Sequence, residues 1–108
     1  MKVIKTTIYM KDFRKKIINK HNTVEEGRIK AIENLIIQSE NMKELMKNPL
    51  SKVYNIEKKK GDLKEIYTAR INNKLRMYMK PVGDYPYKLD EIIEIILKEI
   101  DDKHYGNG

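Results

Sequence analysis

Apolar positions along this chain follow different periods in its two halves. Residues 3–9, VIKTTIY, are rich in β-branched side chains and show no helical stripe, which predicts a first strand. From Lys11 to about Asn48 the apolar residues recur at helical spacing, which predicts two helices. After Ser51 turn residues and alternating side chains return, which is typical of β-structure.

The helical region is expected to form a hairpin that bends at the His21-Asn22 step. The next residues, TVEE, resemble a capping box in which the Thr23 hydroxyl reaches first-turn amides and Glu26 reaches back. The second helix should be the longer one and should kink near Ser39. It must stop before Pro49, because proline disfavours helical geometry at the preceding residue. Its core stripe is predicted to be Ile29, Ile32, Leu35, Ile36, Leu45 and Met46.

Residues 61–76, GDLKEIYTARINNKLR, predict a β-hairpin after a turn at Gly61-Asp62 and a short extended piece over residues 53–56. A two-residue loop at 72–73 would mix apolar and charged side chains on both faces. A three-residue loop at 72–74 separates them, because side chains alternate between the faces of a strand. One face then pairs Ile71 with Leu75, Ala69 with Met77 and Tyr67 with Met79; the other pairs Arg70 with Arg76, Thr68 with Tyr78 and Ile66 with Lys80.

Two arginines directly opposite each other on a sheet repel. Guanidinium groups bind phosphate well, so a face carrying Arg70, Arg76, Thr68, Tyr78 and Lys80 is suited to an anion. The alternative is a solvated basic face on which each arginine pairs with an acidic neighbour. The pattern of residues leaves both interpretations open.

Residues 89–101, LDEIIEIILKEID, fit two structures. They carry a helical stripe, and they also form a nearly continuous apolar run of the kind found in a central strand. The preceding PVGDYPYK is predicted to be a loop by its prolines and glycine. Length and periodicity do not choose between helix and strand.

Composition narrows the range of functions. The chain has 23 Lys+Arg against 16 Asp+Glu, a net charge of +7, which favours a polyanionic partner such as RNA or the ribosome. It has no cysteine, which fits a reducing cytosol, and His21 and His104 lie too far apart in sequence to suggest a histidine metal cluster. We expect a single cytoplasmic domain over residues 1–108, with no metal, cofactor or membrane partner.

The segment from Lys60 to Arg76 resembles the hairpin of RelE/YoeB/HigB-type toxins, which carry K-G-(D/N), an aromatic, a small residue, R-(I/V)-N and a second arginine. The C-terminal IDDKHY, residues 100–105, resembles the closing strand and terminal signature of the same family. The resemblance implies an α+β fold: an N-terminal strand, a helical hairpin on one face, and a sheet that is antiparallel in its last strands. It also implies that residues 89–101 form a strand.

The resemblance further implies the toxin of a type II toxin–antitoxin system in the RelE/ParE superfamily. Such a toxin is neutralised by a cognate antitoxin protein and cleaves mRNA, usually on the ribosome. The RNA 2′-oxygen attacks the adjacent phosphate, and cationic groups stabilise the crowded phosphorus without a metal.

Family roles carry over to matching positions of this chain. Arg76 would stabilise the phosphorane charge, Arg70 would hold a neighbouring phosphate, and His104 would act as the general acid. Tyr105 would stack on a base or assist proton transfer, and Glu57 loosely matches the glutamate base of YoeB-like members. The residues expected to follow the RNA backbone are Lys58, Lys59, Lys60, Lys64 and Lys80.

Two other classes of function stay open. ParE-type relatives share the implied fold but inhibit gyrase, and they generally lack the terminal histidine, so His104 argues against that activity. A basic module that binds RNA or the ribosome without catalysis is the third possibility.

Overall fold

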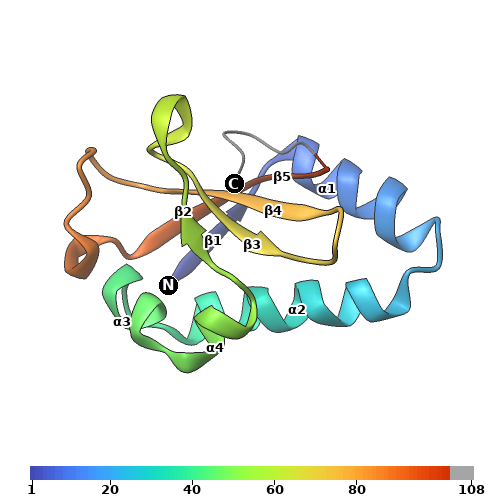
Figure 1. Ribbon diagram of the computed structural model, residues 1–108, viewed down its shortest axis with the longest axis horizontal. Helices are drawn as coiled ribbons and strands as arrows, with labels where there is room; N and C mark the ends of the chain where they lie inside the picture. The colour runs from blue at the N-terminus through green and yellow to red at the C-terminus, as the bar shows by residue number, and fades with distance from the viewer. Residues whose placement is uncertain (103–108) are drawn as a thin grey trace.

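Five strands form one sheet in the computed structural model, which describes residues 1–102. Their order across the sheet is β1-β5-β4-β3-β2, and the strands are labelled in Figure 1. The strands β2 to β5 pair antiparallel with their neighbours, whereas β1 runs parallel to β5. The strand bounds are Lys2–Lys5 (β1), Glu57–Lys58 (β2), Tyr67–Arg70 (β3), Arg76–Pro81 (β4) and Glu94–Asp101 (β5).

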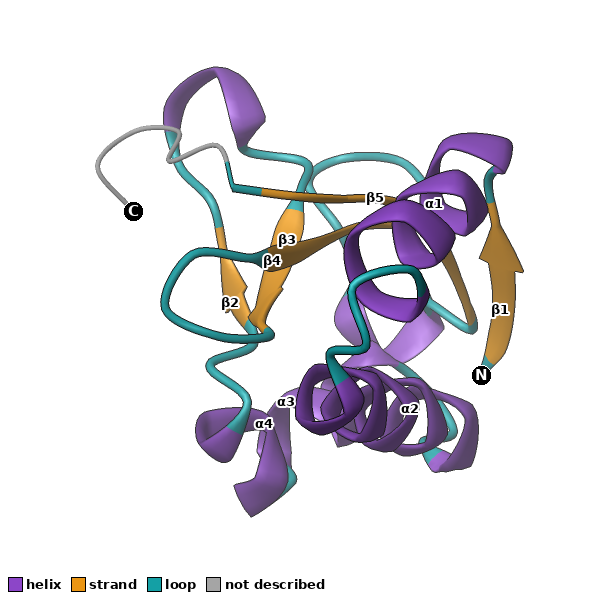
Figure 2. Cartoon of the chain, turned by 90° about the vertical axis from the view of Figure 1, so that its right-hand side faces the viewer, coloured by secondary structure: helices purple, strands orange, loops and turns teal. Residues whose placement is uncertain are grey.

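The helices pack against the sheet, and their buried side chains form one hydrophobic core with buried side chains of the strands. Helix α1 continues into a π-helical turn, η1, and then folds back into α2, forming the expected hairpin beside the strands (Figure 2). The helix bounds are Thr7–Asp12 (α1), Phe13–Ile18 (η1), Thr23–Gln38 (α2), Met42–Lys47 (α3) and Pro49–Val53 (α4). Two 3₁₀ turns cover Gly61–Leu63 (η2) and Leu89–Glu91 (η3).

The predicted helical stripe is buried except at Met46, which is partly buried, and this confirms the amphipathic pattern. The side chains of α2 pack with the inward-facing residues of the sheet, and each fully buried aliphatic side chain contributes roughly 1.5–3 kcal/mol. The buried residues of α2 are Ile29, Ile32, Leu35 and Ile36. The strand residues that belong to the same apolar core are Tyr67, Ala69, Met77, Met79, Ile95, Leu97 and Ile100.

The first strand is shorter than residues 3–9, and that prediction was wrong beyond Lys5. Helix α1 starts at Thr7 because the side chain of Thr6 accepts a 3.0 Å hydrogen bond from the Tyr9 amide. The helical turn also places Tyr9 in the core. The cap and this burial outweigh the β-propensity of the segment.

The bend at residues 21–22 is present, but the capping box is not. His21 has a φ of 55°, and α2 begins at Thr23 itself, so the capping position belongs to Asn22. The Asn22 amide instead donates to the Lys16 carbonyl at 3.0 Å. Glu26 forms a 2.8 Å ion pair with Lys30 on the next turn.

The expected long second helix is divided in two rather than kinked. It ends at Gln38, because the next residue, Ser39, is extended and buried and donates from its hydroxyl to the Leu35 carbonyl at 2.8 Å. Helix α3 restarts where the Asn41 side chain accepts from the Glu44 amide at 2.8 Å. Pro49 does end this region, and it also begins α4, since its missing N–H is not needed at a helix start.

Within residues 89–101, the strand implied by the family resemblance is present over Glu94–Asp101, which excludes the helical alternative. The prediction was wrong for the first part of the segment, because Leu89–Glu91 is a 3₁₀ turn. The run is central in the sheet, between β1 and β4. An irregularity in its pairing with β4, between Tyr78 and Met79, leaves one residue of β5 unpaired. The expected extended piece at 53–56 was wrong in position, because Val53 ends α4 and β2 starts at Glu57.

Candidate functional site

The β3–β4 hairpin has the predicted three-residue loop and register. Arg70 pairs with Arg76, Thr68 with Tyr78 and Ala69 with Met77. The loop is fixed by Asn72, whose side-chain oxygen accepts from the Lys74 and Leu75 amides at 2.8 and 2.7 Å. The two arginines therefore leave the sheet on the same face, at the end next to the loop.

The backbone of Arg70 is held from two sides. Its amide donates to the Tyr54 carbonyl at 2.7 Å, and its carbonyl accepts from Arg28 Nε at 2.7 Å. Its guanidinium donates to the side-chain oxygen of Asn73 in the loop. The contribution of Arg28 could not be found from the sequence, because a charged residue on the polar side of a helix has no distinctive spacing.

Arg76 is anchored to the loop by hydrogen bonds rather than by a carboxylate. Its Nη1 donates to the carbonyls of Asn72 and Leu75 at 2.7 and 3.1 Å. Its pairing position on β5 is Asp101, whose carboxylate lies 3.5 Å from the Lys16 ammonium. Within residues 1–102 neither Arg70 nor Arg76 forms an ion pair. The described part of the chain therefore does not support the alternative in which each arginine pairs with an acidic neighbour.

The basic face is narrower than the sequence suggested. Thr68 and Tyr78 are only 1% and 3% exposed, so they are not part of an open surface. Lys80 is half-buried opposite Ile96. A small cavity of about 80 Å³ lies over Tyr78, lined also by Leu63, Ile66, Lys98 and Glu99. Of the residues that the sequence placed on this face, the accessible cationic ones are therefore at its arginine end.

Glu57 lies on the same face as the arginines. It is exposed on β2 and pairs directly with Thr68, which precedes Arg70 by two residues on β3. Because alternate residues of a strand share a face, its carboxylate projects on the side of Arg70 and Arg76. The register thus brings together three of the residues expected to act in catalysis.

The lysines expected to follow RNA do not form one continuous track. Lys58 pairs with Tyr67 and so projects on the opposite face from Glu57; its ammonium lies 4.9 Å from the centre of the Tyr85 ring. A hydrogen bond with Tyr85 raises the pKa of Lys58. Lys59 is only 8% exposed and offers little surface to RNA. Lys60 and Lys64 are exposed near η2, and Lys64 also lies 5.4 Å from the Tyr85 ring.

The remaining expected site residues, His104 and Tyr105, lie outside the described residues. Among residues 1–102 no group of three or more His, Asp or Glu side chains is placed to hold a metal ion. In the same part of the chain, no helix has the length and apolar character needed to cross a membrane.

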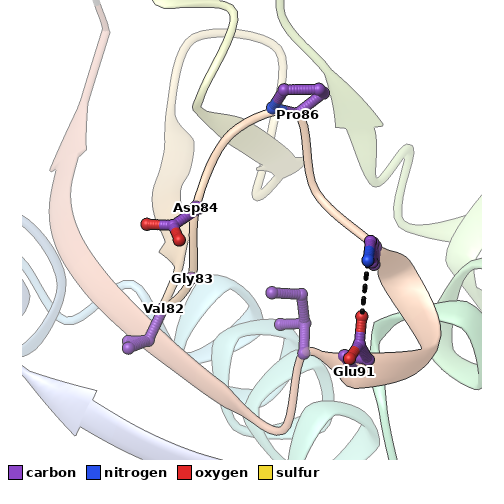
Figure 3. Close-up of a pocket in the computed structure, with 7 residues that line it drawn as sticks. Val82, Gly83, Asp84, Pro86 and Glu91 are labelled. Atoms are coloured by element: carbon purple, nitrogen blue, oxygen red, sulfur yellow. Dashed lines mark ion pairs between the residues drawn. The ribbon is translucent and has the colours of Figure 1, made fainter.

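A separate cavity of about 330 Å³ lies at the other end of β4, in the loop between β4 and β5. Figure 3 shows Val82, Gly83 and Asp84 along one wall and Glu91 across from them. Lys88 and Glu91 form an ion pair of 3.9 Å at its edge. Of the residues expected to bind RNA or to act in catalysis, those that lie within residues 1–102 do not line this cavity.

Solved structures that superpose on this chain include toxins of the RelE/ParE superfamily, so the chain has the RelE-like α+β fold. YafQ from E. coli strain BL21(DE3) superposes with a TM-score of 0.63 at 13% identity, covering 98% of this chain and 97% of YafQ. A copper-bound mutant toxin from Helicobacter pylori gives 0.60 at 20% identity over 94% and 93% of the two chains. The YoeB/ParE toxin from Agrobacterium tumefaciens gives 0.53 at 13% identity over 95% and 99%. No family model and no curated protein matches the sequence.

Proposed function

We propose that this chain is the toxin of a type II toxin–antitoxin system and that it cleaves mRNA on the ribosome without a metal. The observation that carries the proposal is the directly opposed pair Arg70 and Arg76, on one face of a RelE-like sheet. The two opposed like charges repel, and no carboxylate within residues 1–102 forms an ion pair with either of them, so an anion is the natural third member of the cluster. For a chain of net charge +7, an RNA phosphate is a suitable anion.

The proposed reaction moves two protons, one from the attacking 2′-hydroxyl and one to the departing 5′-oxygen. The 2′-hydroxyl loses its proton to a general base and attacks the adjacent phosphorus; the bond to the 5′-oxygen breaks, and that oxygen takes a proton from a general acid. The products are a 2′,3′-cyclic phosphate and a 5′-hydroxyl. Glu57 is the proposed base, and its position on the arginine face supports this role.

The cationic groups act on the phosphorus between these two proton transfers. Arg76 is proposed to stabilise the negative charge that develops on the phosphorane oxygens, and Arg70 to hold the neighbouring phosphate. His104 is the proposed general acid and Tyr105 the proposed stacking residue. Lys60 and Lys64, which are exposed, are the lysines proposed to contact the RNA backbone. Lys58 and Lys80 are proposed to contribute less to this binding.

The proposed partners are the ribosome, its mRNA and an antitoxin in the cytoplasm. An antitoxin segment rich in Asp or Glu, or one that displaces the C-terminal residues, should cover or distort the Arg70/Arg76 face. A toxin–antitoxin structure that left this face open, together with full cleavage by the complex, would contradict this mode of inhibition.

The test is single-turnover cleavage of mRNA on programmed ribosomes. Arg76→Ala should lower the rate by about 10²–10³-fold, because it removes a fixed charge from the transition state. His104→Ala should lower it by about 10²–10⁴-fold by removing the general acid. Lys52→Ala, an exposed change on α4, serves as the charge control and should cleave at the native rate.

Stability must be measured beside activity. Arg76 donates to two loop carbonyls, so Arg76→Ala should cost about 1–2 kcal/mol, more than the small cost expected for a surface residue. Near-native cleavage by folded Arg76→Ala and His104→Ala proteins would refute the proposal. In that case a gyrase supercoiling assay would separate ParE-like inhibition from a non-catalytic RNA- or ribosome-binding module.

A further inference from the structure

A second basic hollow adjoins the arginine face. It has a volume of about 380 Å³ and is lined by residues from the end of η1, the turn after it and the β3–β4 loop. The ribbon in Figure 1 shows the end of η1 and this loop on the right-hand side of the molecule. Its lining is formed by Lys16, Lys20, Asn22, Asn72, Lys74, Leu75 and Asp102. None of its three lysines belongs to the set that the sequence singled out for RNA.

The charge of the hollow comes chiefly from two of these lysines. Lys16 is engaged by carboxylates of Asp12 and Asp101 at 3.7 and 3.5 Å and donates to the Ile100 carbonyl at 2.7 Å. Lys20 and Lys74 are exposed, and neither has a carboxylate partner within residues 1–102. Among the described lining residues three lysines stand against one acidic residue, Asp102, so this part of the lining is basic.

One residue connects the hollow to the candidate site. The Asn72 carbonyl accepts from Arg76 Nη1 at 2.7 Å, while its side-chain oxygen holds the backbone amide of Lys74 at 2.8 Å. On the other wall, the Asn22 side chain donates to the Lys16 carbonyl at 3.0 Å and fixes the turn that follows Lys20. A polyanion held at Arg76 therefore needs to pass only the hairpin loop to reach the hollow.

We infer that this hollow binds a second backbone phosphate of RNA, through Lys20 and Lys74, beside the phosphate held at Arg76. The inference rests on the proposed function for the identity of the polyanion and extends it to a new contact. The phosphate belongs either to the single-stranded message or to ribosomal RNA, since both present the same group. Two separate binding measurements distinguish these sources.

The first measurement uses a labelled single-stranded RNA of about twelve nucleotides in which every 2′-hydroxyl is methylated, so that it cannot be cleaved. At about 0.1 M salt, Lys20→Ala/Lys74→Ala should bind it about 25-fold more weakly than the native protein. The slope of log K against log salt should fall by about 1.4, or about 0.7 for each lost phosphate contact. The second measurement repeats the comparison with vacant ribosomes in a sedimentation assay.

The matched control is Lys43→Ala/Lys52→Ala, which removes the same charge from exposed positions on α3 and α4. It should lower affinity far less, and Lys20→Arg/Lys74→Arg should restore native binding because it keeps both charges. A thermal melt of each variant checks that it is folded.

The results separate this inference from the proposed function. A specific loss with free RNA assigns the phosphate to the message, and a loss with vacant ribosomes alone assigns it to ribosomal RNA. If Lys20→Ala/Lys74→Ala behaves like the control in both measurements, the hollow is not a phosphate site. Absence of mRNA cleavage by the native protein would overturn the proposed function. The two binding measurements do not involve cleavage, so they test the phosphate site separately.

Discussion

The side chain of Arg28, on α2, holds the main chain of Arg70 at the end of β3. Arg28 Nε donates to the Arg70 carbonyl at 2.7 Å, and Nη2 donates to the Val53 carbonyl at 3.0 Å. The guanidinium also lies 4.9 Å from the centre of the Tyr54 ring, and the Tyr54 carbonyl accepts from the Arg70 amide. One side chain thus ties together the helical layer, the end of α4 and the arginine end of the sheet.

Arg28→Ala should lower the free energy of unfolding by about 2–3 kcal/mol. The substitution removes two charge-assisted hydrogen bonds and a cation–π contact, and it leaves two carbonyls with one donor fewer. Lys30→Ala, on the same helix, removes only a solvent-exposed ion pair with Glu26 and should therefore cost far less. Urea denaturation of both variants is the measurement, and equal losses would contradict a special role for Arg28.

Asn72→Ala should loosen the loop that carries Arg76. The change removes the acceptor for the Lys74 and Leu75 amides and should cost about 1–2 kcal/mol. Asn72→Asp keeps that acceptor but brings a carboxylate toward Glu25, which the native side chain meets with its amide at 3.3 Å. The aspartate variant should therefore recover only part of the loss. Thermal melts test this order, and an alanine variant as stable as the native protein would refute it.

Two glycines with open space around them should respond to alanine in opposite directions. Gly27 lies inside α2, so Gly27→Ala should stabilise the protein by about 0.5–1 kcal/mol. Gly61 has a φ of +68°, so Gly61→Ala should destabilise it by roughly 1–2 kcal/mol. Neither new methyl group meets another atom within 4 Å. The difference between the two changes in unfolding free energy therefore reports the effect of backbone conformation alone. Chemical denaturation giving the same sign for both would contradict this account.

Stability should fall at alkaline pH because of Tyr9. Burial, reinforced by the 2.6 Å hydrogen bond from its hydroxyl to Glu33, raises the pKa of Tyr9 above its ordinary value. Burial also raises the pKa of Tyr87, to about 12. The neutral phenols are favoured in the folded protein, so their contribution is complete below about pH 10 and is lost as the pH rises toward the folded values.

The expected slope is a loss of up to about 1.4 kcal/mol per pH unit above about pH 10 for each such tyrosine. Tyr9→Phe should make this slope shallower, because the variant has one titrating phenol fewer. It also loses the hydrogen bond to Glu33, which lowers its stability at neutral pH. The measurement is urea unfolding of both proteins across the alkaline range. Parallel curves for the native protein and Tyr9→Phe would show that Tyr9 does not titrate in this way.

Much of the sheet could be predicted from the sequence, because alternation along a strand is a local property. The parity of the Asn72–Lys74 loop followed from the requirement that apolar residues share a face, and it placed Arg70 opposite Arg76. The α+β fold and the strand at residues 94–101 followed from the family resemblance, and the helical stripe of α2 from its period. These features depend on side-chain order along the chain.

Only the tertiary structure decided which of these residues meet and which are exposed. Segment 7–9 became helical because Tyr9 is buried against distant residues, and the second helix ended at a buried Ser39. Strand pairing put Glu57 on the arginine face and turned Lys58 away from it, while burial removed Thr68 and Tyr78 from the open surface. The positions of Arg28, Lys20 and Lys74 depend on contacts between segments far apart in the chain, and local patterns of hydrophobicity and charge carry no information about such contacts.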